Sequence, residues 1–504
     1  MFSAQRCTVE SMNRKDLSKE NWKKKAKDRG QTIRNKNRQE KAREAYISKI
    51  ESKLQQAEEK IKALEARQKR ELPDAGVYSR SAVIILCVNI YLFGRISFSS
   101  IPRVLAQLSL GSWIPSPKAI RDWVCKLGLR NLNMARKHSG DWLAIVDISI
   151  DIAYKKVLMV LRVPAEALVA GKAMTLKDVM CVGLEVKESW NGDSIYEALG
   201  RIFGDAKGLL AVIKDGGTDL EKGVRLWRNA HKAKGLPAVF LISDISHFVA
   251  NLLKAEFSKQ LNFSEISGTV KGCLSKLYQS KFSFLAPPKI RTKGRFMAIS
   301  RLARWFDRLR NVLGGPGRAP HGSLLEELRS IVGGLGHMSY ILDRFSDICL
   351  KLTEAMEILK NKGLNQYTYR EVMKIVETLP VRSKARTKFE RWLNTHLSIQ
   401  KRLSIGQNGL LVTSDIIETL FGVYKNMVAR SLKAEINRSI LCIPALCGTL
   451  TDAKIAEALG TIKQKDLDEW GRTNIGITNA SKRRRFNDGH RLEEILQEAG
   501  KTAA

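Results

Sequence analysis

The sequence predicts an α/β protein with a mixed sheet core, flanked by helices and interrupted by a long helical insertion. Between Trp142 and about Lys254, short runs rich in Val, Ile and Leu alternate with amphipathic helical patterns, which is typical of strands in such a sheet. On both sides of this stretch the apolar residues recur with helical spacing. With 504 residues and 44% hydrophobic content, the chain can bury several cores, and about three to four domains are expected.

The charge of the chain points to a polyanionic partner. Lys and Arg number 86 against 51 Asp and Glu, a formal net charge of +35. Neutralising phosphates releases condensed counterions, so nucleic acid is the partner that this charge favours. No apolar run approaches the roughly 18 residues of a membrane-spanning helix, and the N-terminus lacks the apolar core of a signal peptide. We therefore expect a cytoplasmic protein without membrane insertion.

Two classes of site are disfavoured by the motifs that the chain lacks. The eight cysteines are scattered and form no CxxC pair, which predicts reduced thiols that fill cores and no structural zinc site. The glycine-rich segments contain no GxxxxGK[ST] signature, so we expect no nucleotide cofactor.

Residues 1–75 are expected to form a basic arm that ends in a short coiled coil. Apolar residues there alternate in spacings of three and four, as at the a and d positions of a heptad: Ile47, Ile50, Leu54, Ala57, Ile61 and Leu64. Two interpretations have equal weight. The stripe either pairs subunits, which predicts a homo-oligomer, or packs on the chain's own core.

Residues 76–137 are predicted to form three short helices. Gly94 is expected to close the first, and Pro117 to begin the third, which we expect to end at Gly128. Two short helices joined by a turn suggest a helix-turn-helix DNA-binding domain. The basic residues expected to contact DNA from its last helix are Lys118, Arg121 and Lys126.

Residues 138–260 carry the predicted sheet. Three consecutive strands, WLAIVDISI, YKKVLMVLRV and DVMCVGLEV, are followed by two strand and helix units that begin with LLAVIK and AVFLIS. This order matches the ribonuclease H fold. The last helix of the core is expected within residues 408–447.

Carboxylates stand where the predicted strands end. Asp147, Asp215 and Asp244 each close an apolar run, and a later acidic helix carries Glu418. A carboxylate just past the last apolar residue of a buried strand lies at the rim of the sheet, where it can reach a hydrated cation. The layout predicts a site for two-metal phosphoryl transfer, because two Mg²⁺ ions require hard carboxylate ligands from separate elements.

The segments VDISID, IKDGGTDLEKGV, ISDISHFVANLLK and SDIIETLFGVYK together resemble the catalytic core of DDE transposases of bacterial insertion sequences, of the Mutator-like type with a helical insertion before the final glutamate. The resemblance covers roughly residues 138–260 and 408–430. It implies a prokaryotic, nucleoid-associated enzyme that binds the double-stranded terminal repeats of its element and the target DNA. It assigns catalysis and the ligation of Mg²⁺ or Mn²⁺ to Asp147, Asp215 and Glu418, with Asp244 and His247 as an accessory (C/D)xxH pair.

Each acid has a competitor in the sequence. Asp151 competes for the role of the first acid, Asp244 for that of the second and Asp415 for that of the third. Two of these acids could instead have a role only in local structure, in a turn or a helix cap. Asp215 lies in a Lys-Asp-Gly-Gly stretch that favours a tight turn. Asp244 can cap the following helix.

The remaining segments are an all-α insertion, residues 261–407, and a C-terminal helix with a basic tail, residues 448–504. Residues 482–485 are expected to be a disordered phosphate contact. The entrance of the insertion is basic with interleaved aromatics, which favours DNA binding, although core packing is the favoured role of its tryptophan. The candidate DNA contacts there are Lys289, Arg291, Lys293, Arg304 and Trp305.

The function that the sequence predicts is that of a DNA transposase, which cleaves the 3′ ends of its element and transfers them into target DNA. Two alternatives are a structure-selective nuclease of the same fold without strand transfer, and a catalytically inactive DNA-binding protein derived from a transposase.

Overall fold

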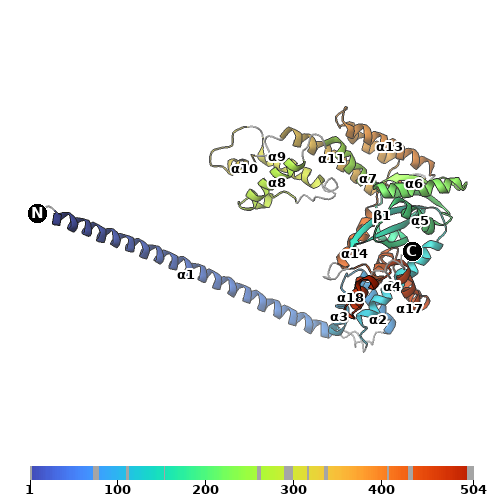
Figure 1. Cartoon of the computed structure of the whole chain (residues 1–504), viewed down its shortest axis with the longest axis horizontal. Coiled ribbons are helices and arrows are strands. Elements are labelled where there is room, and N and C mark those ends of the chain that lie inside the picture. Colours follow the sequence, from blue (N-terminus) through green and yellow to red (C-terminus); the bar gives the residue numbers. More distant parts are fainter. Residues whose placement is uncertain are drawn as a thin grey trace. The chain divides into compact units, whose positions relative to one another are not determined.

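The structure is a computed structural model, in which the chain forms two compact units, Met1–Val77 and Tyr78–Ala504 (Figure 1). It describes residues 3–71, 79–108, 113–152, 154–257, 263–288, 299–314, 317–333, 339–403, 405, 408–428 and 435–495. Among the helices in these ranges, none is both long and apolar enough to cross a membrane.

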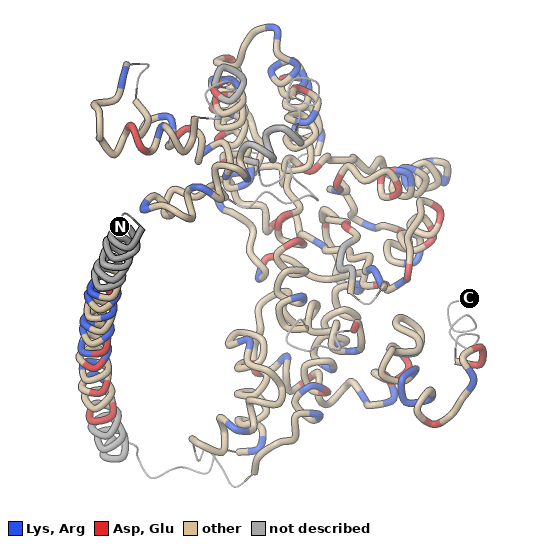
Figure 2. The backbone as a smooth tube through the Cα atoms, turned by 60° about the vertical axis from the view of Figure 1, so that its left-hand side comes forward, with Lys and Arg blue, Asp and Glu red and all other residues tan. Residues whose placement is uncertain are grey.

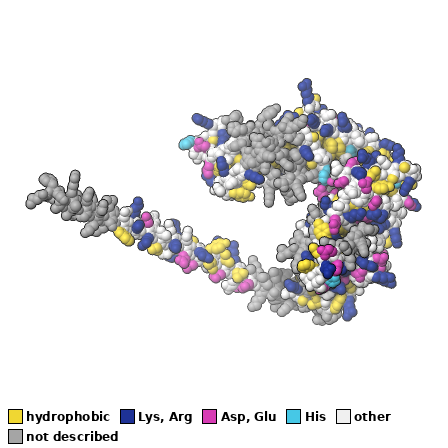
Figure 3. Space-filling model, in the orientation of Figure 1, with side chains coloured by type: hydrophobic (Ala, Val, Ile, Leu, Met, Phe, Trp, Pro, Cys, Tyr) yellow, Lys and Arg dark blue, Asp and Glu magenta, His cyan; other side chains and the backbone are white. Residues whose placement is uncertain are grey.

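The first unit contains one continuous helix, α1 (Ser3–Glu71). Basic residues predominate in the N-terminal half of its described part and acidic residues join them further along (Figure 2), and hydrophobic side chains gather at a few places on it (Figure 3). Three residues of the predicted heptad stripe, Ile47, Ile50 and Leu54, are 46%, 48% and 58% exposed. Within its own unit this stripe has no second described element to pack on, so pairing of subunits through it stays a prediction.

The second unit is built on a mixed five-stranded sheet, as the sequence predicts, with order β3-β2-β1-β4-β5. The first three strands form an antiparallel meander, whereas β4 runs parallel to β1 and β5 parallel to β4. This arrangement is compatible with a ribonuclease H-like fold. The strands are β1 (Trp142–Ile152), β2 (Lys155–Pro164), β3 (Met180–Lys187), β4 (Leu209–Lys214) and β5 (Phe240–Ser243).

Helices cover both faces of the sheet because side chains alternate between the faces along each strand. Ala144 and Val146 of β1 belong to the apolar cluster formed with α5 (Gly192–Phe203) and α6 (Thr218–Ala233). Leu143 and Ile145 belong to the cluster that includes α7 (Ile245–Phe257) and α14 (Asp415–Val428). Asp147 follows in the register of Leu143 and Ile145, on the α14 side of the sheet.

The region before the sheet contains α2 (Arg80–Leu92), α3 (Ile101–Leu108) and α4 (Pro117–Lys137). Pro117 begins α4 as predicted, but the prediction that this helix ends at Gly128 is wrong, because α4 continues to Lys137. Gly128 is buried inside the helix, where an added Cβ would lie 1.8 Å from the carbonyl oxygen of Leu441. The glycine serves close packing between two backbones and not helix termination.

Helix α4 is also the last helix of the predicted helix-turn-helix, the one expected to contact DNA. One face of α4 packs against η5 (Arg438–Leu441) and α15 (Cys442–Leu446). Of its candidate DNA contacts, Lys118 is exposed, while Arg121 and Lys126 are half-buried. Reading of DNA by this region stays a prediction.

Between α7 and α14 the described residues are almost entirely helical, as the periodicity predicts. The helices are α8 (Phe263–Tyr278), α9 (Ile299–Leu313), α10 (Leu324–Val332), α11 (Ser339–Lys362), α12 (Gln366–Glu377) and α13 (Lys384–Arg402), with one short 3-10 turn, η3 (Ser283–Leu285).

A buried carboxylate fastens this insertion to the sheet domain. The side chain of Glu256 on α7 is only 4% exposed. Its Oε1 lies 2.8 Å from Nη2 of Arg344 on α11, and its Oε2 accepts a hydrogen bond from the backbone N–H of Ala385 on α13. We expect Glu256→Gln to lower the free energy of unfolding by about 1–3 kcal/mol, because one buried donor loses its charged partner. Urea unfolding measures this change.

The matched control is Glu371→Gln, which breaks the more exposed pair with Lys362 and is expected to cost less than about 1 kcal/mol. Equal costs for the two variants would contradict the fastening role of Glu256.

The chain after α15 adds α16 (Asp452–Thr461), α17 (Gln464–Asn474) and α18 (Asn479–Asn487). The expected disorder of residues 482–485 is wrong, since they lie in α18. Nζ of Lys482 lies 3.1 Å from the hydroxyl of Tyr154, at the turn between β1 and β2. The seven cysteines from Cys87 onward are free and buried, as predicted.

Candidate active site

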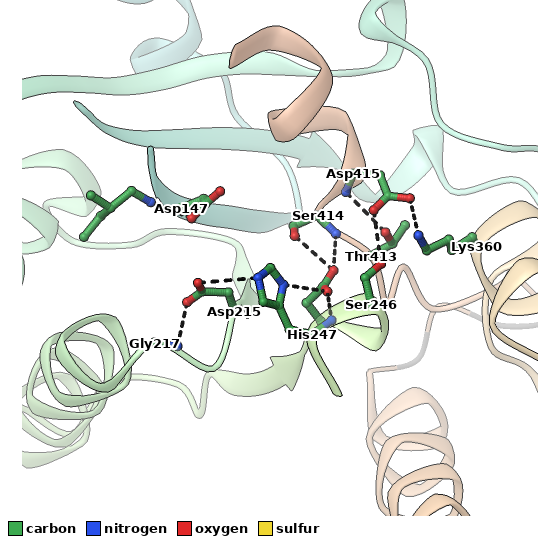
Figure 4. A network of polar contacts seen from close by, with 11 residues as sticks. Asp147, Asp215, Gly217, Ser246, His247, Lys360, Thr413, Ser414 and Asp415 are labelled. Carbon is green, nitrogen blue, oxygen red and sulfur yellow. Dashed lines mark hydrogen bonds and ion pairs between the residues drawn. The ribbon is translucent and has the colours of Figure 1, made fainter. Parts of the chain in front are cut away.

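Two aspartates lie side by side where the parallel pairing of β1 with β4 ends. The expectation that Asp147 closes its strand is wrong, because β1 continues to Ile152 through its antiparallel pairing with β2. In the register of β1 and β4, Val146 pairs with Lys214. Asp147 and Asp215 are the next residues on the two strands. Because β4 ends at this point, the two carboxylates lie next to each other at the rim of the sheet that the end of β4 forms (Figure 4).

Asp147 is a buried carboxyl group with few partners. The residue is 8% exposed, and its Oδ1 accepts a hydrogen bond of 2.6 Å from the backbone N–H of Ile148. Burial, followed by the negative charge of Asp215, raises its pKa to about 7, and the charge of Glu418 adds to the rise. A buried acid that its neighbours repel has the electrostatic environment of a cation site.

Asp215 uses one carboxylate oxygen to stabilise a turn, while the other accepts no hydrogen bond from the described residues. Its Oδ1 accepts a hydrogen bond of 2.9 Å from the backbone N–H of Gly217, as the tight-turn interpretation predicts. Its Oδ2 lies 3.9 Å from Nε2 of His247 (Figure 4). The turn therefore uses one carboxylate oxygen and leaves the other facing the rim.

Asp244 is fully engaged by the protein. Its Oδ1 accepts hydrogen bonds from the backbone N–H of His247 (2.8 Å) and from Nδ1 of that histidine (3.1 Å), so it caps α7. Its Oδ2 accepts from the backbone N–H (2.7 Å) and the hydroxyl (2.9 Å) of Ser414. Burial raises the pKa of Asp244, but these hydrogen bonds outweigh it and the pKa is lowered overall. Four accepted bonds use the capacity of both oxygens.

His247 stands between two of the acids. Its Nδ1 lies 3.1 Å from Oδ1 of Asp244, and its Nε2 faces Asp215 (Figure 4). The hydrogen bond to Asp244, together with the charges of Asp244, Asp215 and Glu418, raises the pKa of His247 to about 9 despite its burial. At neutral pH this side chain is therefore cationic and offsets part of the negative charge at the rim.

Two acids occupy the first turn of α14, and their surroundings differ. Asp415 is held by Nζ of Lys360 at 2.7 Å and by the hydroxyl of Ser246 at 3.2 Å. Glu418 is exposed, and its side chain makes no hydrogen bond or ion pair with the described residues. Partial burial of its carboxyl group, and then the charges of Asp415 and Asp244, raise the pKa of Glu418.

The three acids of the predicted triad influence one another electrostatically, yet they do not form a closed cage. In the described part of the chain, no three acidic, histidine or cysteine side chains are arranged to hold a metal by themselves. Mg²⁺ commonly binds through one or two carboxylates together with water and substrate phosphate. Asp147 and Asp215, each with one oxygen that accepts no hydrogen bond from the described residues, fit that smaller set.

Sequence reasoning missed three residues of this network: Ser246, Lys360 and Ser414. Serine before an acidic helix is a recognisable cap signal, so the position of Ser414 was readable, whereas its bond to Asp244 was not. Nothing local in the sequence connects Lys360 of α11 with Asp415.

The candidate DNA contacts are spread over several elements. Lys289, Arg291 and Lys293 lie outside the described residues. Arg304 forms an ion pair of 2.8 Å with Glu357. Trp305 packs against the apolar core, and its Nε1 donates to the carbonyl of Leu285 at 2.8 Å. Lys118 and Arg121 line a hollow of about 850 Å³ beside residues 94–100.

One residue of the insertion reaches the end of β5. Nε2 of His396 on α13 accepts a hydrogen bond of 3.2 Å from the backbone N–H of Ser243, and Nδ1 donates to the carbonyl of Trp392 at 2.8 Å. Burial lowers the pKa of His396 to about 4. Its contribution to stability is therefore fully present above about pH 6.5, the ordinary value, and is lost as the pH falls toward 4.

We expect His396→Gln to flatten the loss of stability between pH 6.5 and 4.5, where the wild type loses up to about 3 kcal/mol through this group. Urea unfolding at several pH values measures the slope. The exposed His321, replaced in the same way, serves as the control and should leave the slope as in the wild type. An unchanged slope in His396→Gln would show that the residue is protonated in the folded protein.

Comparisons with known proteins give little further guidance. No family model matches the chain, and no curated protein matches it. Among solved structures, the chain is similar to one described as a Drosophila P element transposase strand transfer complex, with a TM-score of 0.39 and 13% sequence identity. That match covers 81% of this chain and 99% of the other.

Proposed function

We propose that this chain is a DDE-type DNA transposase. The observation that supports this most strongly is the pair Asp147 and Asp215, which directly follow the last paired residues of the parallel strands β1 and β4, beside the helix that carries Glu418. Acids that converge from separate elements on one rim are suited to phosphoryl transfer. The formal charge of +35 supports DNA as the substrate.

Mg²⁺ or Mn²⁺ bound at this rim would polarise the scissile phosphate and activate water or a 3′-hydroxyl for in-line attack. Asp147 and Asp215 would hold the ions, joined by Glu418. The saturated oxygens of Asp244 argue for Asp215 as the second acid. The contacts of Lys360 and Ser246 with Asp415 argue for Glu418 as the third.

The chain's own groups prepare the site for a polyanion. With its pKa near 7, Asp147 holds a proton in part of the molecules at neutral pH and must release it when a cation binds. His247 keeps positive charge next to Asp215 and lessens repulsion of the incoming phosphates. Lys and Arg side chains, spread over the face seen in Figure 3, would neutralise further phosphates.

Binding of the element's terminal repeats is assigned in this proposal to the helices α2 to α4 and to the basic arm. Pairing of two ends is assigned to a homo-oligomer formed through the apolar stripe of α1. In a prokaryotic cell such a protein would be associated with the nucleoid.

The decisive experiment is a strand-transfer assay with labelled fragments of the DNA that flanks the chain's own coding sequence, with supercoiled plasmid as the target and Mg²⁺ or Mn²⁺ present. Joined products are expected from the wild type and not from Asp215→Asn. Asp219→Asn, an exposed acid four residues further along, is the matched control and should join normally. Nicking without joining would indicate a structure-selective nuclease, and binding without either would overturn the enzymatic proposal.

A further inference from the structure

Asp244 connects two parts of the site that lie far apart in the sequence. One carboxylate oxygen binds His247 at the start of α7, and the other binds Ser414, 170 residues later, at the start of α14. We propose that Asp244 is a positioning residue, which clamps α14 and thereby fixes Glu418 at the rim of the sheet. This inference rests on the proposed function, because it concerns how the third acid of that site is placed.

The clamp grips the helix at its beginning. The carbonyl of Ser414 accepts the first hydrogen bond of α14, from the backbone N–H of Ile417 at 2.9 Å. A carboxylate at this end interacts favourably with the partial positive charge of the helix N-terminus. Glu418 lies one turn further along the helix. The hydrogen bonds from Ser414 to Asp244 therefore fix how the first turn of α14, which carries Glu418, is rotated about the helix axis and where it lies along that axis.

The other end of the clamp is tied to the strands that carry the first two acids. The backbone N–H of Asp244 donates to the carbonyl of Lys214 at 2.9 Å, directly before Asp215. The next residue, Ile245, donates to the carbonyl of Val412 at 2.9 Å, which adds a second link to the segment leading into α14. Through His247, whose Nε2 is 3.9 Å from Asp215, the same carboxylate also reaches the second acid.

A ligand role for Asp244 conflicts with these contacts. The residue is 1% exposed, and each of its oxygens already accepts two hydrogen bonds. To bind a cation, it would have to release either the cap of α7 or the hold on α14. Catalytic groups must be held to within a fraction of an ångström, so loosening α14 alone would reduce turnover.

The test uses the full-length protein with Asp244→Asn, Ser414→Ala and Ser414→Thr, and Ser383→Ala as the control. Ser383 is an equally buried serine that caps α13 away from the acids. Hydrogen exchange of residues 410–428, measured without metal or DNA, reports the clamp directly. We expect exchange there to be at least about tenfold faster in Asp244→Asn and Ser414→Ala, but not in the control.

Measurements of turnover and of ion binding distinguish a positioning role of Asp244 from a role as a metal ligand. The rate of DNA cleavage at saturating Mn²⁺ is expected to fall about 10–100-fold in Asp244→Asn and Ser414→Ala, with Mn²⁺ affinity changed less than about threefold. Ser414→Thr keeps the hydroxyl and should restore both exchange protection and turnover.

Three outcomes would overturn the clamp. Loss of Mn²⁺ binding in Asp244→Asn together with normal Ser414→Ala would make Asp244 a ligand. Unchanged hydrogen exchange of α14 in both Asp244→Asn and Ser414→Ala would show that these hydrogen bonds do not hold the helix. Failure of Ser414→Thr to restore protection from exchange would exclude the hydroxyl as the group that links α14 to Asp244. If the wild type cleaves no DNA, the proposed function fails, while the exchange measurements still decide whether Asp244 holds α14.

Discussion

Asparagine in place of Asp147 is expected to lower DNA cleavage and joining by at least about 10³-fold, which corresponds to about 4 kcal/mol of transition-state stabilisation. The amide keeps the size of the side chain but removes the negative charge at the centre of the rim. Rates are measured on DNA of the type used in the strand-transfer assay, at saturating Mg²⁺ or Mn²⁺.

The same substitution is expected to stabilise the folded protein at pH 8 in the absence of divalent ions. The pKa of Asp147 is about 7 in the folded protein against an ordinary value of 3.8, so the folded state retains its proton to higher pH than the unfolded chain does. Stability is therefore lost as the pH rises from about 4 to about 7, by up to about 4 kcal/mol. Asparagine cannot ionise and escapes this loss, so the gain should be present at pH 8 and absent at pH 4.

The control for both readouts is Asp219→Asn, which removes one exposed negative charge from the first turn of α6. It should leave joining unchanged and alter stability by less than about 0.5 kcal/mol. Retention of joining by Asp147→Asn would remove this residue from the catalytic set. A stability gain that is the same at pH 4 and pH 8 would show that Asp147 ionises freely in the folded protein.

Alanine in place of Gly128 is expected to cost about 3 kcal/mol or more in the free energy of unfolding. The added Cβ would lie 1.8 Å from the carbonyl oxygen of Leu441, and the opposing atom belongs to a backbone, so no side chain can turn away. Either α4 or the segment η5 to α15 must shift, and both are parts of the core. With a total stability of about 5–15 kcal/mol for a typical domain, a large share would be lost.

The matched control is Gly200→Ala in α5, where an added Cβ meets nothing within 4 Å. Because alanine favours the helix over glycine, this variant is expected to gain up to about 1 kcal/mol. Urea unfolding followed by circular dichroism compares the two. A cost below about 1 kcal/mol for Gly128→Ala would mean that α4 and Leu441 are not in close contact.

The strands of this fold could be predicted from the sequence, whereas the role of Gly128 could not. The strands around Asp147 and Asp215 were predictable because a buried strand appears in the sequence as a short run of consecutive apolar residues. Gly128 was misread as a helix end because a glycine that permits close approach of two backbones looks the same, in sequence, as one that ends a helix.

Long-range contacts account for the rest. The cap that Asp244 provides for α7 is local and was readable, whereas its hold on Ser414 joins positions 170 residues apart. The basic residues of α18 were expected to be disordered because of their charge, and no local signal indicates their contact with Tyr154. The candidate site was therefore predictable as a set of acids, but the bonds that orient them were not.

The position of α14 after the insertion also determines when the site can form during synthesis. A ribosome adds about 5–20 residues per second, so the 170 residues between Asp244 and Ser414 take about 9–34 seconds to appear. During that interval Asp147 and Asp215 have already been made, and their strands can pair. The helix that carries Glu418 is absent until the whole insertion has emerged, so a nascent or prematurely terminated chain lacks the third acid.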